Sequence, residues 1–265
     1  MARVIVLVNQ KGGVGKTTTA VNLAAYLARA GRCVLLVDID PQANATVGVG
    51  ARVAEGEPHV YHVLLEPHTA AATVRPTAVE RLWVLPAHAD LAGANIDLVG
   101  VSGREFRLHE ALRQVGGAYD IILIDCPPSL GLLTVNGLVA ADHVLVPVQP
   151  EYYSLEGLGQ LLATVDLIRQ NLKPTLSVLG AIVTMYDARS RLMGAVLQDL
   201  KTNFPAPLFQ TMVPLNVRLA EAPSYGQPIS LYDPRSRGAQ AYEALAVELL
   251  AHLEPLSVEP ARVTL

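Results

Sequence analysis

Residues 4–19 read Val-Ile-Val-Leu-Val-Asn-Gln-Lys-Gly-Gly-Val-Gly-Lys-Thr-Thr-Thr, and this stretch decides the fold. Its first five residues are apolar and mostly β-branched, as expected of a strand buried on both faces of a parallel sheet. The glycines at positions 12, 13 and 15 then allow the backbone to turn sharply and approach a ligand closely. From Thr17 the spacing of apolar residues predicts a helix that stops at Gly31.

A strand, a glycine loop and a helix N-terminus in this order predict a site for phosphate. Free N–H groups and the helix dipole bind the anion, the Lys16 amino group neutralises it, and the Thr17 hydroxyl is placed to bind Mg²⁺. The predicted phosphate-binding residues are Gly12, Gly13, Val14, Gly15, Lys16, Thr17 and Thr18.

The loop differs from the common P-loop. Gln10 stands where that pattern has its first glycine, and a second lysine, Lys11, opens the loop. Lys-Gly-Gly-Val-Gly-Lys-Thr-Thr resembles the deviant Walker A motif of the MinD/ParA ATPases. In that family the early lysine reaches across a nucleotide-sandwich dimer to the partner's phosphates. The resemblance implies a homodimer on ATP binding, in which Lys11 binds the partner's ATP and Lys16 its own; the alternative for Lys11 is a solvated loop charge.

Length and composition bound the architecture. The chain has 265 residues, 51% of them hydrophobic, and a net charge of −4. We expect one domain over residues 1–254 and a loose tail over 255–265. No apolar run approaches the ~20 residues that span a bilayer, and the first strand begins too early to leave room for a signal peptide. Because the global charge is acidic, any contact with nucleic acid requires a local basic patch.

The two cysteines, Cys33 and Cys126, show no metal-binding spacing. They are interpreted as small residues beside strands in a reducing cytoplasm. A two-cysteine iron–sulphur site between subunits, as in nitrogenase-type iron proteins, is the open alternative.

A second buried strand runs from Cys33 to Asp38 and leads into Asp-Ile-Asp-Pro. Pro41 ends the regular structure, so Asp40 is expected at the carboxyl edge of the sheet, where open α/β sheets bind ligands. Asp40 is then a candidate to orient or polarise an attacking water; the alternative is a turn or helix-cap residue. The segment is similar to switch I of the MinD/ParA family, which implies that task for Asp40, with Asp38 adjusting the Mg²⁺ shell through water.

Residues 119–129 predict a third strand that ends in Asp125. This is a Walker B arrangement, in which the acid holds Mg²⁺ through a water or contacts the Thr17 hydroxyl. Thr17, Asp40 and Asp125 are therefore the predicted metal-site residues. The following Pro-Pro-Ser looks like the family's switch II, and its two prolines stiffen the loop so that it moves as a segment.

The remaining pattern predicts a doubly wound, mostly parallel sheet of seven to eight strands flanked by helices, the α/β class. Residues 48–80 are expected to form a loop with short helical pieces. Their histidines, His59, His62 and His68, have a spacing that fits no clear metal site and are predicted to be solvated surface residues. Further strands are expected at residues 82–86, 143–148, 176–185 and 209–214, and longer helices at 104–115, 155–172 and 238–253.

Thr184-Met-Tyr-Asp187 follows a predicted strand. Guanine-reading GTPases carry Asn/Thr-Lys-x-Asp at this place, and Met185 replaces the lysine, which weakens a GTP interpretation. In ParA-like ATPases the residues matching Pro214 and Asn216 lie against the adenine. The resemblance thus makes Met185, Pro214 and Asn216 the candidates for the base site.

The resemblance extends from Lys11 to Ala222 and is closest to the Soj/ParA chromosome-partitioning ATPases. It implies an ATP-sandwich dimer in the cytoplasm, associated with the nucleoid, that binds double-stranded DNA without reading its sequence. It also implies a ParB-type partner that stimulates hydrolysis and so releases the DNA. Arg189 and Arg218 are the implied DNA contacts.

Two alternatives remain from the sequence. A membrane-cycling, MinD-like ATPase requires a C-terminal amphipathic helix rich in Lys and Arg. Residues 254–265 instead contain two prolines, two glutamates and one arginine, which argues against a stable membrane anchor. A metabolic P-loop enzyme, such as dethiobiotin synthetase or a kinase, requires a small-substrate pocket, and the sequence has no distinct acceptor-binding motif.

Overall fold

The computed structural model describes residues 2–151, 154–187 and 189–253. The predicted tail, 255–265, lies outside these residues. Within them a seven-stranded sheet has the order β3-β4-β2-β5-β1-β6-β7. The strands are β1 Arg3–Leu7, β2 Val34–Asp38, β3 Arg75–Pro76, β4 Leu82–Leu85, β5 Ile121–Asp125, β6 His143–Val148 and β7 Ser177–Val183.

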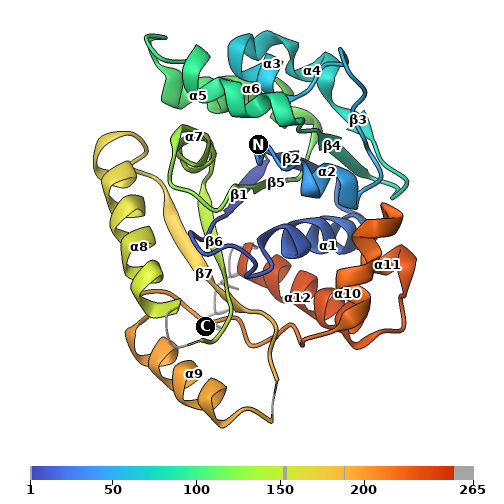
Figure 1. The fold of residues 1–265 in the computed structure, drawn as a ribbon, viewed down its shortest axis with the longest axis vertical. Coiled ribbons are helices and arrows are strands. Elements are labelled where there is room, and N and C mark those ends of the chain that lie inside the picture. The colour runs from blue at the N-terminus through green and yellow to red at the C-terminus, as the bar shows by residue number, and fades with distance from the viewer. Residues whose placement is uncertain (1, 152–153, 188, 254–265) are drawn as a thin grey trace, which may run out of the picture.

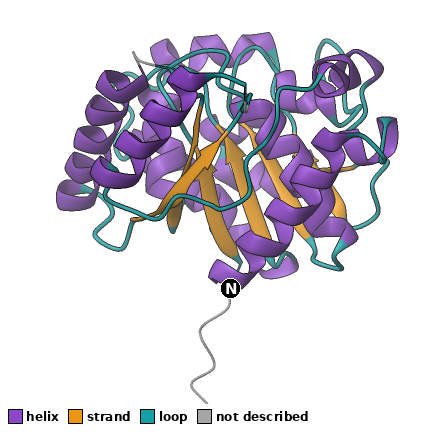
Figure 2. Ribbon diagram, turned by 90° about the horizontal axis from the view of Figure 1, so that it is seen from below, coloured by secondary structure: helices purple, strands orange, loops and turns teal. Residues whose placement is uncertain are grey.

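All neighbouring strands are parallel except β3, which pairs antiparallel with β4 at one edge. Helices cover both faces of the sheet (Figures 1 and 2). The α-helices are α1 Lys16–Arg29, α2 Asn44–Gly48, α3 Val60–Leu65, α4 Ala70–Thr73, α5 Ala94–Asp97, α6 Arg107–Val115, α7 Leu132–Ala140, α8 Ser154–Asn171, α9 Arg191–Asn203, α10 Val217–Glu221, α11 Ile229–Tyr232 and α12 Arg237–Leu253. The predicted α/β class is confirmed.

The core has two parts, one on each face of the sheet, because side chains along a strand alternate between the faces. In β1, Val6 packs in the cluster that includes residues of α6, α7 and α8. Ile5 and Leu7 pack in the other cluster, with residues of α1 and α12. The Thr19 hydroxyl of α1 also lies 3.1 Å from the Tyr242 hydroxyl of α12. The sheet is thus fixed between two helical layers.

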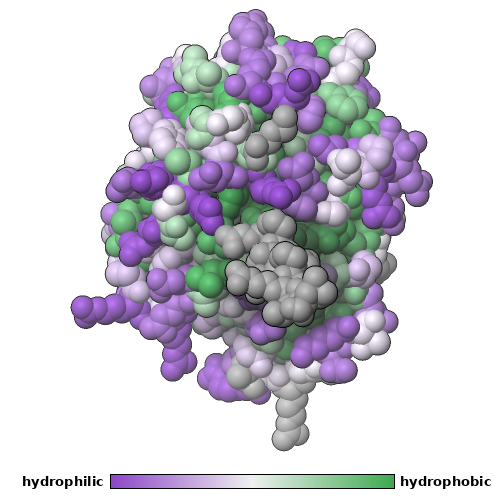
Figure 3. Space-filling view, turned by 180° about the vertical axis from the view of Figure 1, so that it is seen from behind, coloured by the Kyte–Doolittle hydropathy of each residue, from purple (hydrophilic) through white to green (hydrophobic). Residues whose placement is uncertain are grey.

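Figure 3 shows the face opposite that of Figure 1, with hydrophilic side chains projecting at the margin and apolar residues in the recesses between them. This is the surface expected when the apolar side chains of both layers face the sheet. Among the described residues, no helix has the length and apolar character that crossing a bilayer requires.

The predicted strand at residues 209–214 is wrong. This segment meets the sheet only through isolated bridges, from Leu208 to Ala181 and from Pro214 to Tyr186. Proline has no backbone N–H and interrupts a strand's hydrogen-bond ladder. Pro214 has no N–H to donate, and the Gln210 and Thr211 backbones donate to the Glu248 carboxylate instead of to a strand, so the segment does not become an eighth strand.

Candidate functional site

The predicted phosphate loop lies between β1 and α1 (Figure 1). Gly15 has φ of 83°, in the left-handed region that glycine adopts without steric cost. The Thr184 hydroxyl donates a hydrogen bond of 2.8 Å to the Val14 carbonyl, and Asn9 Nδ2 donates one of 2.8 Å to the Pro147 carbonyl. These bonds tie the loop to the carboxyl ends of β7 and β6.

The N-terminus of α1 points its free backbone donors at this loop. Gly15 is the N-cap residue and supplies no capping side chain, and the first turn contains no acidic residue. The first N–H groups of a helix have no intrahelical partner, and with the helix dipole they favour an anion. Thr17 and Thr18 add hydroxyls in the same turn, so the arrangement can bind phosphate.

Lys16 lies at the centre of the site. It is 6% exposed, and its amino group donates a 3.1 Å hydrogen bond to the Lys11 carbonyl, so the side chain folds back over the loop. Burial lowers the pKa of the Lys16 amino group, and the nearby carboxylates of Asp125 and Asp40 oppose this shift. A buried cation beside free N–H donors can neutralise a bound phosphate.

Asp125 has a buried carboxylate whose oxygens have no hydrogen-bond partner among the described residues. Burial raises the pKa of Asp125 well above its usual value, the neighbouring Asp38 raises it further, and the Thr17 hydroxyl and Lys16 act against this. Unpaired carboxylate oxygens near a hydroxyl are a donor set that suits Mg²⁺. The residues present therefore fit the predicted metal.

Asp38 has a structural role that the sequence did not predict, and its contact with the Mg²⁺ shell stays a prediction. Its register partner is Asp125 on β5, but its own oxygens are used by the loop that follows it. They accept hydrogen bonds from the Thr46 backbone and hydroxyl, both at 2.8 Å, and from the Asp40 backbone at 3.1 Å. Asp38 thus holds the loop that carries Asp40, and the sequence analysis missed Thr46 as its partner.

Asp40 is buried at the carboxyl edge of the sheet, as predicted. Its Oδ1 accepts a 2.9 Å hydrogen bond from the Gln42 backbone. The turn role that the sequence left open is therefore present, and the carboxylate also lies close enough to Lys16 to oppose the lowering of its pKa. The geometry allows Asp40 both to close a turn and to face the phosphate site.

The three predicted base-site residues come together beside the phosphate loop. Met185, Pro214 and Asn216 line one pocket together with Gly15 and Thr18. The two segments that carry them run side by side, since the Tyr186 backbone donates to the Val213 carbonyl at 3.0 Å and accepts from the Leu215 backbone at 3.2 Å. The remaining lining residues are Thr184, Val213, Leu215, Leu219, Ala220 and Tyr242.

The Lys11 side chain pairs with an acid from outside the phosphate loop. Its amino group forms an ion pair of 2.5 Å with Glu151, and both side chains are partly exposed. The sequence analysis did not single out Glu151, because an acid 140 positions away carries no local signal.

The two predicted DNA-contact arginines are exposed, and each is paired with an acid of its own segment. Arg189 makes two hydrogen bonds to Asp187, of 2.9 and 2.8 Å. Arg218 on α10 pairs with Glu221 at 2.8 Å and lies 3.5 Å from Asp233. The two segments that carry them meet at a bridge between Tyr186 and Pro214.

The prediction that the histidines of residues 48–80 are solvated is wrong for His59. His59 is 2% exposed, whereas His62 and His68 lie at the surface. Its ring lies among those of Tyr61, His62 and His88. His88 and Asp90 come from a segment outside the one considered, so spacing along the chain could not reveal the group.

Comparison with known proteins identifies the family. Residues 2–178 match the family described as AAA domain. The sporulation initiation inhibitor protein Soj of Bacillus subtilis (strain 168) is 53% identical over 252 residues, which cover 95% of this chain and 100% of that protein. The chromosome-partitioning ATPase Soj of Thermus thermophilus is 52% identical over 252 residues, covering 95% and 97%. The chain belongs to the Soj/ParA family of chromosome-partitioning ATPases.

Solved structures relate the Soj/ParA chain to other P-loop NTPases. Cobyrinic acid a,c-diamide synthase from Mycobacterium smegmatis, with bound ATP analog and magnesium, has a TM-score of 0.84 at 39% identity, covering 96% of each chain. The septum site-determining protein MinD from Pyrococcus horikoshii, complexed with Mg-ADP, has a TM-score of 0.76 at 29% identity, covering 97% of this chain and 100% of MinD. The predicted P-loop fold is confirmed.

Proposed function

We propose that the chain is a Mg²⁺-dependent ATPase that acts as a dimerisation switch in chromosome segregation. The observation that carries the proposal is that the buried Lys16 amino group and a buried Asp125 carboxylate without a hydrogen-bond partner among the described residues both lie near the N-terminus of α1. A nucleoside triphosphate with Mg²⁺ supplies both the anion and the cation that these groups require. The similarity to Soj and ParA proteins supports the cellular role.

Each part of the site has one task in binding. The N–H groups of the loop and Lys16 bind the phosphates, while Thr17 and Asp125 hold the metal. The pocket of Met185, Pro214 and Asn216 takes the adenine. Held by Thr17 and Asp125, Mg²⁺ would neutralise the charge that develops in phosphoryl transfer.

Asp40 orients the water that attacks the terminal phosphate. Phosphoryl transfer depends mainly on positioning and charge, so a fixed carboxylate near the phosphates is sufficient for this task. The turn that Asp40 closes with the Gln42 backbone, and the bond from its own backbone to Asp38, support a fixed position.

Dimerisation follows from the second lysine. Lys11 leaves Glu151 and contacts the phosphates bound by the partner subunit, so the dimer persists only while the terminal phosphate is present. The exposure of both side chains supports this exchange, because a solvated ion pair is weak, about 0–1 kcal/mol.

The ATP dimer then binds double-stranded DNA through Arg189, Arg218 and their copies in the partner. Contacts with phosphates are independent of sequence and depend steeply on salt. A ParB-type protein stimulates hydrolysis and releases the DNA, which associates the protein with the nucleoid in the cytoplasm.

Sedimentation tests the proposal directly. Purified protein is measured with ADP, with ATP and with a slowly hydrolysed ATP analogue, each with Mg²⁺ and with or without duplex DNA. We expect a dimer and DNA binding only with triphosphate, and neither in Lys16→Ala. A wild-type protein that stays monomeric at saturating analogue contradicts the switch.

Two added samples separate the alternatives. Co-sedimentation with anionic vesicles in place of DNA favours a membrane-cycling ATPase. A monomer that hydrolyses ATP without dimerising or binding DNA favours a metabolic enzyme, the activity named for the structurally similar synthase.

A further inference from the structure

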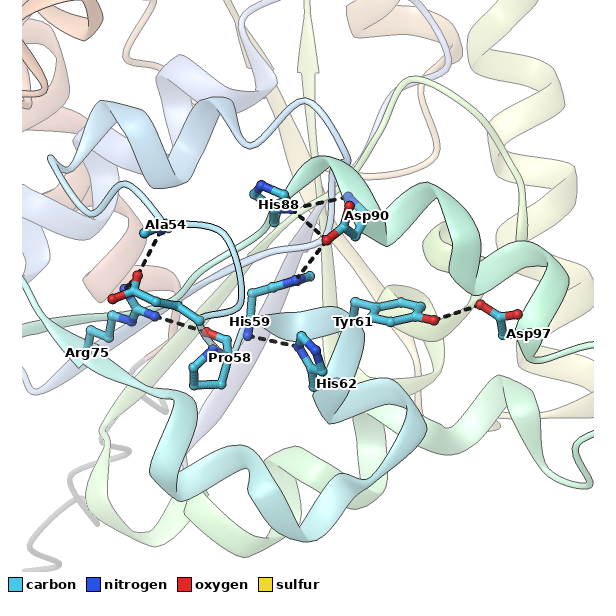
Figure 4. Close-up of polar contacts among 10 residues, drawn as sticks. Ala54, Pro58, His59, Tyr61, His62, Arg75, His88, Asp90 and Asp97 are labelled. Carbon is cyan, nitrogen blue, oxygen red and sulfur yellow. Dashed lines mark hydrogen bonds and ion pairs between the residues drawn. The ribbon is translucent and has the colours of Figure 1, made fainter.

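His59 comes together with His88 and Asp90, which lie in a later segment of the chain (Figure 4). His59 directly precedes α3, and the other two lie between β4 and α5. One possible ligand atom from each of the three residues lies within 4.8 Å of the other two. His88 Nδ1 is 3.0 Å, and His59 Nε2 is 3.8 Å, from Asp90 Oδ2.

The second observation is the state of the His59 ring. Its side chain is 3% exposed, and its Nδ1 is buried and has no hydrogen-bond partner within the described residues. The other ring nitrogen faces Asp90 across 3.8 Å, a gap longer than a hydrogen bond. A buried imidazole with neither nitrogen hydrogen-bonded is costly, and an ion bound at Nε2, the nitrogen that faces Asp90, would give the ring a ligand contact on that side.

The spacing of the three groups suits one shared ion. Nitrogen and oxygen ligands lie about 2.1 Å from zinc, which puts tetrahedral ligands roughly 3.4 Å apart. The distances of 3.0 and 3.8 Å to Asp90 Oδ2 bracket this value. Asp90 is 66% exposed and His88 31%, so both can adjust and solvent can complete the coordination.

We propose that His59, His88 and Asp90 bind one divalent transition-metal ion, with Zn²⁺ as the ion that fits best. Two imidazoles and a carboxylate favour zinc over Mg²⁺, which prefers oxygen ligands. Among the described residues, His62 is not part of the group whose possible ligand atoms meet within 4.8 Å. His88 Nδ1 accepts a 3.4 Å hydrogen bond from the Asp90 backbone, and the ion replaces this bond when it binds.

The site is connected to the nucleotide site by short hydrogen bonds. Ala87, next to His88, donates its backbone N–H to the Thr46 hydroxyl at 2.8 Å. That hydroxyl donates in turn to Asp38 Oδ2 at 2.8 Å. The backbone of Val60, the residue after His59, also donates to the Pro86 carbonyl at 2.8 Å. An ion that clamps His59 to His88 therefore also fixes the residue that supports the Asp38 loop.

Zn²⁺ titration tests the proposal on the full chain, freed of metal by a chelator and kept in excess Mg²⁺ so that the oxygen-rich nucleotide site is filled. We expect one Zn²⁺ per chain by calorimetry and a raised unfolding temperature. His88→Ala and Asp90→Asn should each weaken Zn²⁺ binding at least tenfold. Co²⁺ in place of Zn²⁺ should give a visible absorption spectrum that both variants lose.

His68→Ala is the matched control, because His68 is exposed and pairs with Glu66, which is not part of the proposed site. It should bind Zn²⁺ as the wild type does. His88 and Asp90 are preferred to buried His59 as test positions, since their loss leaves the core intact. The proposal is overturned if the wild type binds no Zn²⁺, or if both variants bind it with unchanged affinity. Neither result bears on ATP binding, so the proposed function stands or falls separately.

Discussion

Lys11 Nζ lies 2.5 Å from Glu151 Oε2, so the lysine that marks this family is held by an acid of its own chain. The two side chains are 35% and 46% exposed. An ion pair of this exposure stabilises by about 0.2–1 kcal/mol because solvent screens it. Moving the Lys11 amino group from Glu151 to another anion therefore costs little free energy.

Glu151→Gln should tighten ATP-dependent dimerisation by about two- to fivefold, since Lys11 no longer leaves a charged partner. ATP affinity of the monomer should not change, because Lys16 binds the nucleotide of its own subunit. Sedimentation with a slowly hydrolysed analogue measures the dimer constant. Glu80→Gln, at an exposed acid beside Arg81, is the control. Unchanged or weaker dimerisation would show that Lys11 does not exchange.

Lys16→Ala should lower nucleotide affinity by about 10- to 100-fold, because a charge-assisted hydrogen bond contributes roughly 1.5–3 kcal/mol. Titration with a fluorescent ATP analogue measures it. Lys173→Ala, at a lysine that faces Asp142, is the matched control and should bind normally. Equal affinity in both variants would refute the assignment of Lys16.

The sheet and its acidic edge were predictable because their signals are local. The uninterrupted apolar runs of β1, β2 and β5 can only be buried strands, and the acids that end β2 and β5 then meet at one edge. The extended segment at residues 209–214 was misjudged because its composition resembles a strand, while its bonding depends on prolines and on neighbours distant in the sequence.

The partners of the site residues were not predictable in the same way. Glu151 meets Lys11, and Thr46 meets Asp38, only after the chain has folded. His59 gives the clearest case, since its burial is produced by a loop about 30 residues later that carries His88. Pairings of this kind leave no periodic or spacing signal in one sequence.

Asp40→Asn should retain ATP binding and dimerisation but lower hydrolysis by about 100-fold or more, because the amide cannot act as the base or attract the water as strongly. Asparagine keeps an acceptor for the Gln42 backbone, so the turn is preserved. Release of phosphate by the ATP-bound dimer is the measurement. If the variant hydrolyses ATP as fast as the wild type, Asp40 only stabilises the turn and does not act on the water.

Arg218→Ala should weaken DNA binding to the same extent for unrelated sequences and reduce the dependence on salt. Glu221→Gln should do the opposite, because it frees Arg218 from its 2.8 Å partner. Filter binding with duplexes of different sequence, at several salt concentrations, measures both. If the two variants bind equally, Arg218 is not part of the DNA surface.

The buried side chains of Asp38 and His59 change the free energy of unfolding in opposite directions as the pH rises. Burial raises the pKa of Asp38 to about 6, against hydrogen bonds from Thr46 and Asp40. Burial lowers the pKa of His59 to about 4, aided by His62 and His88. As the pH rises from about 4 to 6, the folded state releases its Asp38 proton later than the unfolded state, so stability falls. His59 acts in the reverse sense, since the unfolded state holds more protons between about pH 4 and 6.5.

Asp38→Asn separates the carboxyl effect from that of His59, because it removes the Asp38 titration together with the charge that raises the pKa of the neighbouring Asp125, and leaves His59 unchanged. The variant's free energy of unfolding, relative to the wild type, should rise between pH 4 and pH 7 by on the order of 2–3 kcal/mol. Loss of the hydrogen bonds to Thr46 shifts this difference in unfolding free energy by a similar amount at every pH, so the way the difference changes with pH is kept. Urea unfolding of nucleotide-free protein in chelator, across this range, measures the difference. A difference that does not vary with pH would mean that Asp38 is ionised at pH 4 in the folded chain.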